Sequence, residues 1–75
     1  MKTKTIEAVY KELGKRIVEA RKARGMSQER LATLSEIDRS HMGFIEQGRR
    51  RPTIATIYKI ATALDLRLES FFKDL

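Results

Sequence analysis

An arginine-rich segment in the middle of the chain contains the residues best suited to binding a charged partner. Between Arg39 and Arg51 there are four arginines and a single acidic residue, Glu46. A guanidinium donates paired hydrogen bonds to phosphate oxygens or to the O6 and N7 atoms of guanine. Because charged side chains usually lie in solvent whatever their role, the segment is a candidate site only if the surrounding elements present these side chains together. The residue types favour recognition of a polyanion over catalysis.

Composition excludes several other kinds of chemistry. The chain has no cysteine and one histidine, His41, so neither a disulfide framework nor a set of metal ligands is expected. We find no paired carboxylates, activated nucleophile or phosphate-cradling glycine loop, so we expect neither an enzyme nor a cofactor. No apolar run approaches the ~20 residues of a membrane span. Glu7, Lys11 and Glu12 interrupt the stretch where a signal peptide would be apolar, which predicts a cytoplasmic protein.

The formal net charge of +6 is unevenly distributed along the 75 residues. Residues 1–24 contain eight Lys or Arg and three Glu, whereas residues 60–75 contain two basic and three acidic residues and two of the three phenylalanines. A chain of this length forms one domain with one modest core. We therefore expect a single domain, residues 1–75, with a basic surface for a polyanion and an apolar surface for another purpose.

Apolar residues recur at steps of three and four, which predicts an all-α fold of five helices. Ser27, Asp38 and Thr53 are suitable N-cap residues, and Asp38 could accept from the amide of Ser40 or His41. Pro52 cannot lie inside a helix, so it separates the third expected helix from the fourth. The expected helices span residues 5–24, 28–34, 39–48, 54–64 and 67–73.

The second and third of these helices have the features of a helix-turn-helix at residues 27–48. This unit joins two short helices by a turn of three or four residues and places the second helix in the major groove of DNA. The side chains expected between the two helices are apolar or small: Leu31, Ala32, Leu34, Ile37, Met42 and Ile45.

The segment SQERLATLSEIDRSHMGFIEQGRRRPT resembles the lambda-repressor-like, or XRE, helix-turn-helix family. The resemblance extends from about residue 13 to residue 72. Glu36 departs from the pattern, because the family often has a left-handed glycine there, and another residue costs of order 1 kcal/mol. Within the family, the chain is most similar to controller proteins of restriction-modification systems, although phage Cro-like repressors and antitoxin-type regulators share most of the same features. The resemblance implies a sequence-specific transcription regulator that binds a pseudo-palindromic operator as a homodimer.

The third helix is expected to read bases, beginning with Arg39, whose guanidinium can bind guanine. Ser40 follows as a hydroxyl for a base edge or a phosphate, and Gly43 would let the backbone approach the groove. Phe44 either touches a thymine methyl or belongs to the core. Phosphate contacts are expected from residues near the two helix ends and the basic loop: Gln28, His41, Gln47, Arg49, Arg50, Arg51 and Thr53. The role of Gln28 and an ion pair between Glu46 and Arg21 are implied by the resemblance.

Apolar residues crowd the C-terminal end, and one short helix cannot turn all of them inward. We expect a dimerisation region at about residues 57–75, formed by Leu64, Leu66, Leu68, Phe71 and Phe72. The alternatives are that these residues only close a monomer core, or that they bind a toxin in an antitoxin-type complex. The expected partners are double-stranded DNA and a second copy of the chain, with RNA polymerase as a further candidate.

Overall fold

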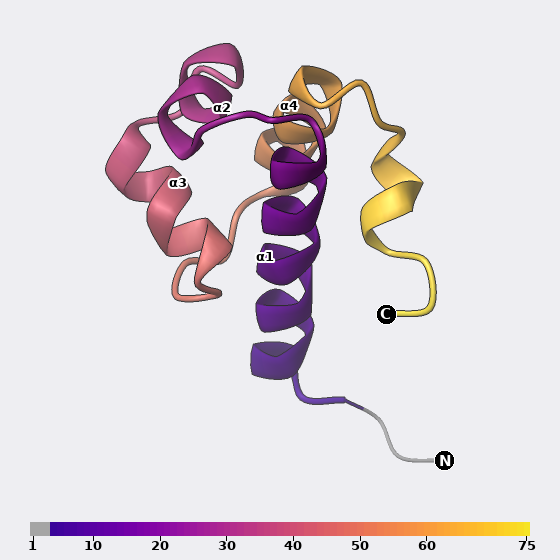
Figure 1. The fold of residues 1–75 in the computed structure, drawn as a ribbon. Coiled ribbons are helices and arrows are strands. Elements are labelled where there is room, and N and C mark those ends of the chain that lie inside the picture. Colours follow the sequence, from indigo (N-terminus) through magenta and orange to yellow (C-terminus); the bar gives the residue numbers. More distant parts are fainter. Residues whose placement is uncertain (1–3) are drawn as a thin grey trace.

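The computed structural model describes residues 4–75, which form four α-helices and one 3₁₀-helix (Figure 1). The helices are α1 (Ile6–Ala23), α2 (Gln28–Leu34), α3 (Arg39–Glu46), α4 (Ile54–Ala63) and the 3₁₀-helix η1 (Leu68–Phe71). The all-α fold and the order of its elements agree with the sequence analysis. The last element differs, because a four-residue 3₁₀-helix takes the place of the α-helix expected at residues 67–73.

Three of the four α-helices begin at a side-chain cap. The hydroxyls of Thr5, Ser27 and Thr53 each accept a hydrogen bond from the amide three residues later, at 3.0–3.1 Å. Asp38 directly precedes α3 as expected, but its carboxylate accepts no hydrogen bond from the amides of that helix. The predicted capping bond is therefore wrong. The helix starts were therefore predictable, whereas the cap of α3 was not.

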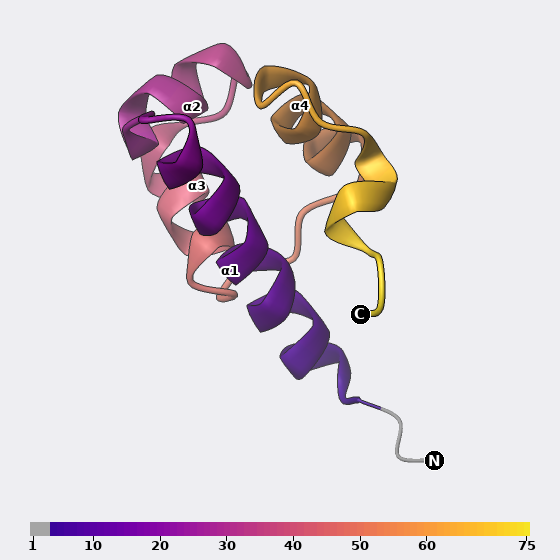
Figure 2. The ribbon, with the colours of Figure 1, turned by 45° about the vertical axis from the view of Figure 1, so that its right-hand side comes forward.

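The core is formed by side chains of every element, and Figure 2 shows α3 on one side of α1 and α4 with η1 on the other. Helix α1 packs against α3 and against η1, so the helix-turn-helix and the C-terminal segment both lie against this long helix. Helix α4 in turn contacts α2 and η1. No helix within residues 4–75 is long and apolar enough to cross a membrane. The buried apolar side chains come from every element: Leu13, Ile17, Leu31, Ala32, Met42, Ile45, Ile57, Ile60, Ala61, Leu64 and Phe71.

Four large hydrophobic side chains within residues 4–75 are exposed. Leu34 was expected between α2 and α3, but 43% of it is exposed. At about 100° per residue, the buried Leu31, Ala32 and Ser35 define a face of α2 from which Leu34 lies about 110° away. Ile6, Ile54 and Tyr58 are exposed because they lie near a helix end or at the edge of the packed face.

The turn between α2 and α3 is closed by main-chain hydrogen bonds. Glu36 has a φ of 58°, the left-handed conformation for which glycine is usual. Its amide donates to the carbonyl of Thr33 at 3.1 Å, and the amide of Ile37 donates to that of Ala32 at 2.9 Å. This pair of bonds is the Schellman arrangement that ends many helices. The non-glycine residue therefore occupies the same turn at a cost of about 1 kcal/mol.

Candidate nucleic-acid interface

Helix α3 contacts α1 through the main chain at Gly14. A Cβ atom at Gly14 would lie 2.5 Å from the carbonyl oxygen of Glu46 and 2.6 Å from that of Ile45. No larger residue fits there unless the two helices separate. The sequence analysis missed this contact, although a glycine in the middle of an amphipathic helix, next to the buried Leu13, was a visible signal. Gly14 fixes how closely α3 lies against α1.

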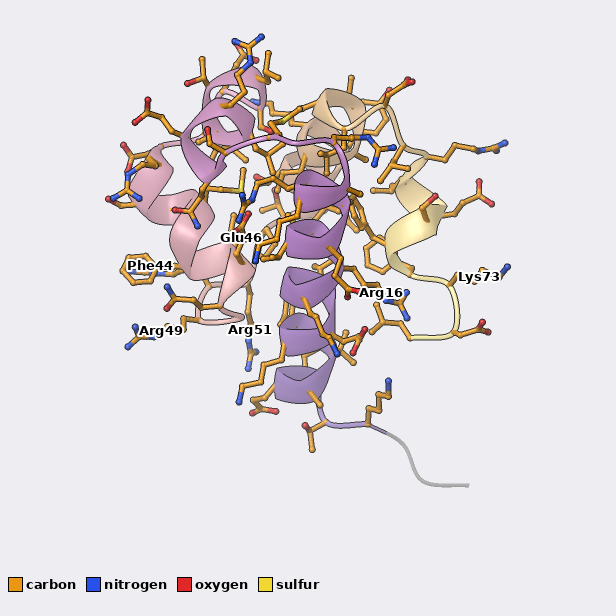
Figure 3. All side chains as sticks on the ribbon, viewed as in Figure 1. Arg16, Phe44, Glu46, Arg49, Arg51 and Lys73 are labelled. Atoms are coloured by element: carbon orange, nitrogen blue, oxygen red, sulfur yellow. The ribbon has the colours of Figure 1, made fainter. Side chains whose placement is uncertain are left out.

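A buried ion pair joins the same two helices, as the family resemblance implied. Arg21 Nε donates to Glu46 Oε2 at 2.8 Å and Arg21 Nη2 to Glu46 Oε1 at 3.2 Å. Only 12% of the Arg21 side chain and 4% of the Glu46 side chain are exposed. Arg21 Nη1 also donates to the carbonyl of Met26. Glu46, which is labelled in Figure 3, points between α3 and α1 and away from the side of α3 that Phe44 occupies.

The hydrogen bonds continue from Glu46 to the start of α3. Gln28 Nε2 donates to Glu46 Oε1 at 2.9 Å, and Arg39 Nη1 donates to Gln28 Oε1 at 3.1 Å. We call this series, Arg21, Glu46, Gln28 and Arg39, the hydrogen-bonded chain. Its last member, Arg39, is exposed at the first turn of α3.

Gly43 is buried, and the absence of its side chain makes room within the protein. A Cβ there would lie 3.4 Å from Gln28 Oε1 and 3.7 Å from Gln28 Nε2. The prediction that Gly43 lets the backbone approach a DNA groove therefore loses its premise, because the Gln28 amide covers that position.

Phe44 lies beside the basic loop rather than in the core. Its ring is half-buried, and the Cζ atoms of Arg49 and Arg50 lie 5.7 Å and 5.6 Å from the ring centroid. These are cation–π distances. Figure 3 shows Phe44 and Arg49 on the outer side of α3, pointing away from α1. The core interpretation of Phe44 is thus wrong, and the ring holds two arginines next to the exposed side of α3.

Arg51 takes a different direction from its two neighbours. Its Cζ lies 5.6 Å from the ring centroid of Tyr10, and its Nη2 lies 3.7 Å from Glu7 Oε1. Both partners belong to α1. The three consecutive arginines are therefore divided between the α3 side and α1.

The other predicted contact residues are exposed, some with roles inside the protein. Ser40 and His41 lie in the first turn of α3. Gln47 follows α3 and accepts a long, 3.4 Å hydrogen bond from Arg49. Thr53 caps α4 through its hydroxyl. Ser40, His41 and Gln47 thus lie on α3 or directly after it, whereas Thr53 lies at the start of α4.

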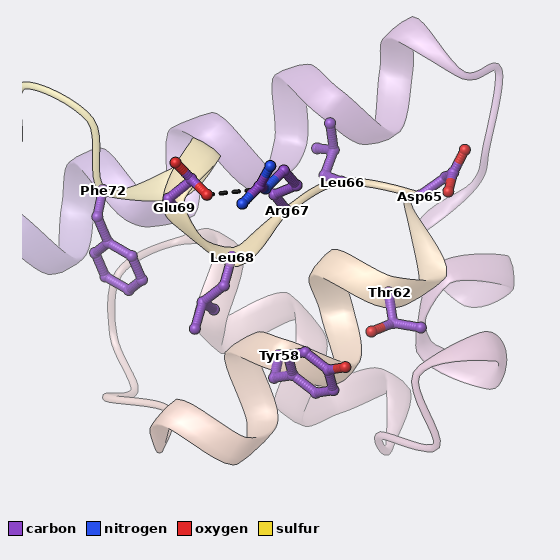
Figure 4. A pocket seen from close by; sticks show the side chains of 8 residues that line it. All are labelled: Tyr58, Thr62, Asp65, Leu66, Arg67, Leu68, Glu69 and Phe72. Atoms are coloured by element: carbon purple, nitrogen blue, oxygen red, sulfur yellow. Dashed lines mark ion pairs between the residues drawn. The ribbon is translucent and has the colours of Figure 1, made fainter.

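The predicted dimerisation residues divide into two groups. Leu64 and Phe71 are 0% and 1% exposed, so they pack inside the chain and the prediction that they form an intermolecular contact is wrong. Leu66, Leu68 and Phe72 are half-buried. They line a surface groove of about 740 Å³ (Figure 4). The remaining residues of the groove are Tyr58, Thr62, Asp65, Arg67 and Glu69.

Arg16 ties the C-terminal segment to α1. Its Nη1 donates to the carbonyl oxygens of Phe71, at 3.1 Å, and Lys73, at 2.6 Å, while its Nε donates to Glu12. Figure 3 shows the Arg16 side chain reaching from α1 to this segment. Sequence reasoning missed this role, because nothing in the spacing indicates that Arg16 meets carbonyls 55 and 57 residues away.

Comparison with known proteins agrees with this geometry. A helix-turn-helix family profile matches residues 17–71, which include α2, α3 and α4 completely. The chain belongs to the helix-turn-helix family. Its fold is a helix-turn-helix of the XRE type that the sequence resembles.

Individual relatives of this helix-turn-helix chain include the HTH-type transcriptional regulator PuuR of Escherichia coli (strain K12). The two are 39% identical over 61 residues, 81% of this chain and 33% of PuuR, so the chain spans about a third of that relative's length. The crystal structure of the restriction-modification controller protein C.AhdI from Aeromonas hydrophila has 45% identity and a TM-score of 0.85, covering 87% of this chain and 98% of that protein. A mutant of the restriction-modification controller protein C.Esp1396I has 31% identity and a TM-score of 0.80, covering 87% and 82% of the two chains.

Proposed function

We propose that this chain is a transcription regulator that binds a pseudo-palindromic operator as a homodimer and controls restriction-modification genes. The proposed control of restriction-modification genes is supported by the similarity to the controller protein C.AhdI, 98% of which is covered. The observation that carries the DNA-binding geometry is the surface of α3, where the exposed Arg39, Phe44 and the basic loop are gathered around one helix held rigidly against α1. A rigid helix with such a surface can enter the major groove.

The proposed contacts fall into two classes. Arg39, Ser40 and Phe44 would meet base edges, because they lie in the first turns of α3 on its exposed side. Arg49 and Arg50, together with Gln47 and His41, would meet phosphates and so set the strength of binding to any DNA.

The proposed dimer uses the groove of Figure 4. The groove is lined by exposed Tyr58 and half-buried Leu66, Leu68 and Phe72, which are apolar side chains already held in place by α4 and η1. A second copy covering the groove would bury this surface and present two reading helices about 34 Å apart, one helical turn of DNA. A single α3 reads few base pairs, so two copies are needed for a selective operator.

Arg39→Ala and Arg50→Ala separate base reading from phosphate binding. We expect Arg39→Ala to weaken binding to the selected operator by about 5- to 150-fold, the equivalent of 1–3 kcal/mol, with little change on random DNA. Arg50→Ala should weaken binding to both and lower the salt dependence of binding. Fluorescence anisotropy at several salt concentrations measures both effects. Equal losses on operator and random DNA for Arg39→Ala would contradict the base-reading role.

Selection of bound sequences from a random DNA pool tests the two-fold operator, and sedimentation of wild type and Leu68→Asp tests the dimer. A two-fold symmetric consensus, together with a monomeric Leu68→Asp variant that binds the operator weakly, supports the proposal. A non-symmetric consensus or a dimeric Leu68→Asp variant contradicts this mode of dimerisation. A stoichiometric toxin partner co-purifying through the same groove would favour the antitoxin-type alternative.

A further inference from the structure

We infer that Arg16 is a positioning residue for dimerisation, because it holds the main chain on both sides of Phe72 and so shapes one end of the groove in Figure 4. This role rests on the proposed dimer and deepens it. Arg16 is not among the residues that line the groove. It therefore acts on a second copy only through the segment that follows η1.

The two main-chain acceptors of Arg16 Nη1 flank Phe72 in the chain. They are the carbonyl oxygen of Phe71, at 3.1 Å, and that of Lys73, at 2.6 Å. Among the main-chain bonds described outside the helices of residues 4–75, no amide donates to either carbonyl. Carbonyls at the end of a helix lack partners within it and are often bonded by a basic side chain. Arg16 supplies that partner from a different helix.

The Arg16 side chain is itself held in one direction. Its Nε donates to Glu12 Oε2 at 3.3 Å, one turn earlier in α1, and 23% of the side chain is exposed. The donors of a guanidinium lie in one rigid plane, so the bond at Nε helps to fix where Nη1 points. The next residue, Ile17, is fully buried in the core. Helix α1 thus gives the guanidinium a fixed base.

Phe72 depends on this support more than its neighbour does. Phe71 is 1% exposed and anchored in the core, whereas Phe72 follows η1 and is half-buried. Figure 4 shows Phe72 at one end of the groove, with its ring on the same side of the segment as the Leu68 side chain. The direction of the main chain at position 72 therefore decides whether the ring lines the groove.

A ring that is already held in place strengthens an interface. Aromatic side chains contribute a large share of the binding energy between proteins. If the segment were loose, the second copy would have to order its main chain and the Phe72 side chain as it bound, and the lost entropy would weaken the dimer. Arg16 removes that loss by ordering the segment within the monomer.

The test measures the dimer dissociation constant by sedimentation equilibrium, at a temperature where circular dichroism shows each variant to be folded. We expect Arg16→Met to weaken the dimer by about 10- to 100-fold. Lys15→Met is the matched control, because it removes a positive charge from the neighbouring exposed position of α1, and it should leave the dissociation constant unchanged. Arg16→Lys keeps the charge without the planar donors, so it should lie between wild type and Arg16→Met. It carries the comparison if Arg16→Met does not fold.

Gly14→Ala separates loss of dimerisation from loss of stability. Gly14 lies on the side of α1 that faces α3, so this variant destabilises the fold away from the groove. We expect it to dimerise more tightly than Arg16→Met at a temperature where both are folded. Equal weakening by the two variants would show that stability alone controls the dimer and would overturn the role of Arg16.

A double-variant cycle tests whether Arg16 acts through Phe72. Phe72→Ala removes the ring, so adding Arg16→Met to it should cause little further weakening of the dimer. Losses that simply add would contradict this coupling.

The outcome for Arg16 is distinguishable from the outcome for the proposed function. A dimeric wild type together with an Arg16→Met variant of the same dissociation constant overturns the positioning role and leaves the proposed dimer intact. A wild type that stays monomeric at every concentration, alone and on the selected operator, instead refutes the proposed dimer.

Discussion

Gly14→Ala is the substitution whose effect is most sharply determined by the structure. The added methyl group would lie 2.5 Å and 2.6 Å from two carbonyl oxygens of α3. Contacts between a carbon and a carbonyl oxygen are normally about 3.3 Å or longer. Neither partner is a side chain that can rotate away, so α1 and α3 must separate by about 0.8 Å.

Two opposing terms give the expected free energy. Alanine gains ~1 kcal/mol over glycine in helix propensity, and overpacking costs about 1–3 kcal/mol. The upper end applies here because main chain is displaced and because separation also lengthens the 2.8 Å bond between Arg21 and Glu46. The net loss of unfolding free energy is therefore about 2 kcal/mol. For a domain of this size that lowers the Tm by roughly 8–16 °C.

Gly43→Ala is the matched control, since both glycines lie inside a helix and gain the same propensity. Its methyl group meets only the end of the Gln28 side chain, which can move by a few tenths of an ångström, so its Tm should rise. Thermal unfolding followed by circular dichroism, with urea titrations at 25 °C, measures both variants. A Gly14→Ala protein as stable as wild type would refute the argument from close backbone contact.

Three further predictions concern groups inside the fold. Ser35 is 1% exposed and its hydroxyl has no hydrogen-bond partner within residues 4–75, so Ser35→Ala should raise the unfolding free energy by about 1 kcal/mol in urea; a loss of similar size would contradict this. Arg16→Met removes the bonds to the C-terminal carbonyls, including that of Lys73, and should cost about 2 kcal/mol and speed amide exchange in η1; unchanged exchange would show that the segment is held otherwise. Glu46→Ala leaves Arg21 buried without its carboxylate and should cost about 3–5 kcal/mol by urea titration; a loss under about 1 kcal/mol would show that Arg21 reaches solvent and would refute this expectation.

The order and approximate bounds of the helices were predictable because their signals are local. Ser27 and Thr53 are hydroxyl residues before an apolar periodic stretch, and both cap a helix as expected. Asp38 has the same local signal but makes no capping bond, since the caps that a side chain can make depend on its rotamer as well as its position. The final helix was overestimated, because apolar content at residues 67–73 does not distinguish a 3₁₀-helix from an α-helix.

Contacts between distant elements were harder to predict. Leu34 continues the apolar spacing of α2, but which side of a two-turn helix is covered depends on where its partners lie. The candidate contact residues around α3 were identified by type and position. Their partners were not, because the bond from Gln28 to Arg39 and the position of Gly14 follow from how the helices are placed in three dimensions.

The aromatic rings beside the basic loop have a consequence for the rate of association. Arg49 and Arg50 lie against Phe44, and Arg51 lies against Tyr10, before any partner arrives. A free arginine side chain loses up to about 2 kcal/mol of rotamer entropy when it is ordered. At the proposed interface, folding has already ordered these arginine side chains in part, so less entropy is lost when DNA binds. A larger fraction of encounters with DNA therefore leads to binding. The rings would thus speed productive capture of DNA by ordering the arginines beforehand.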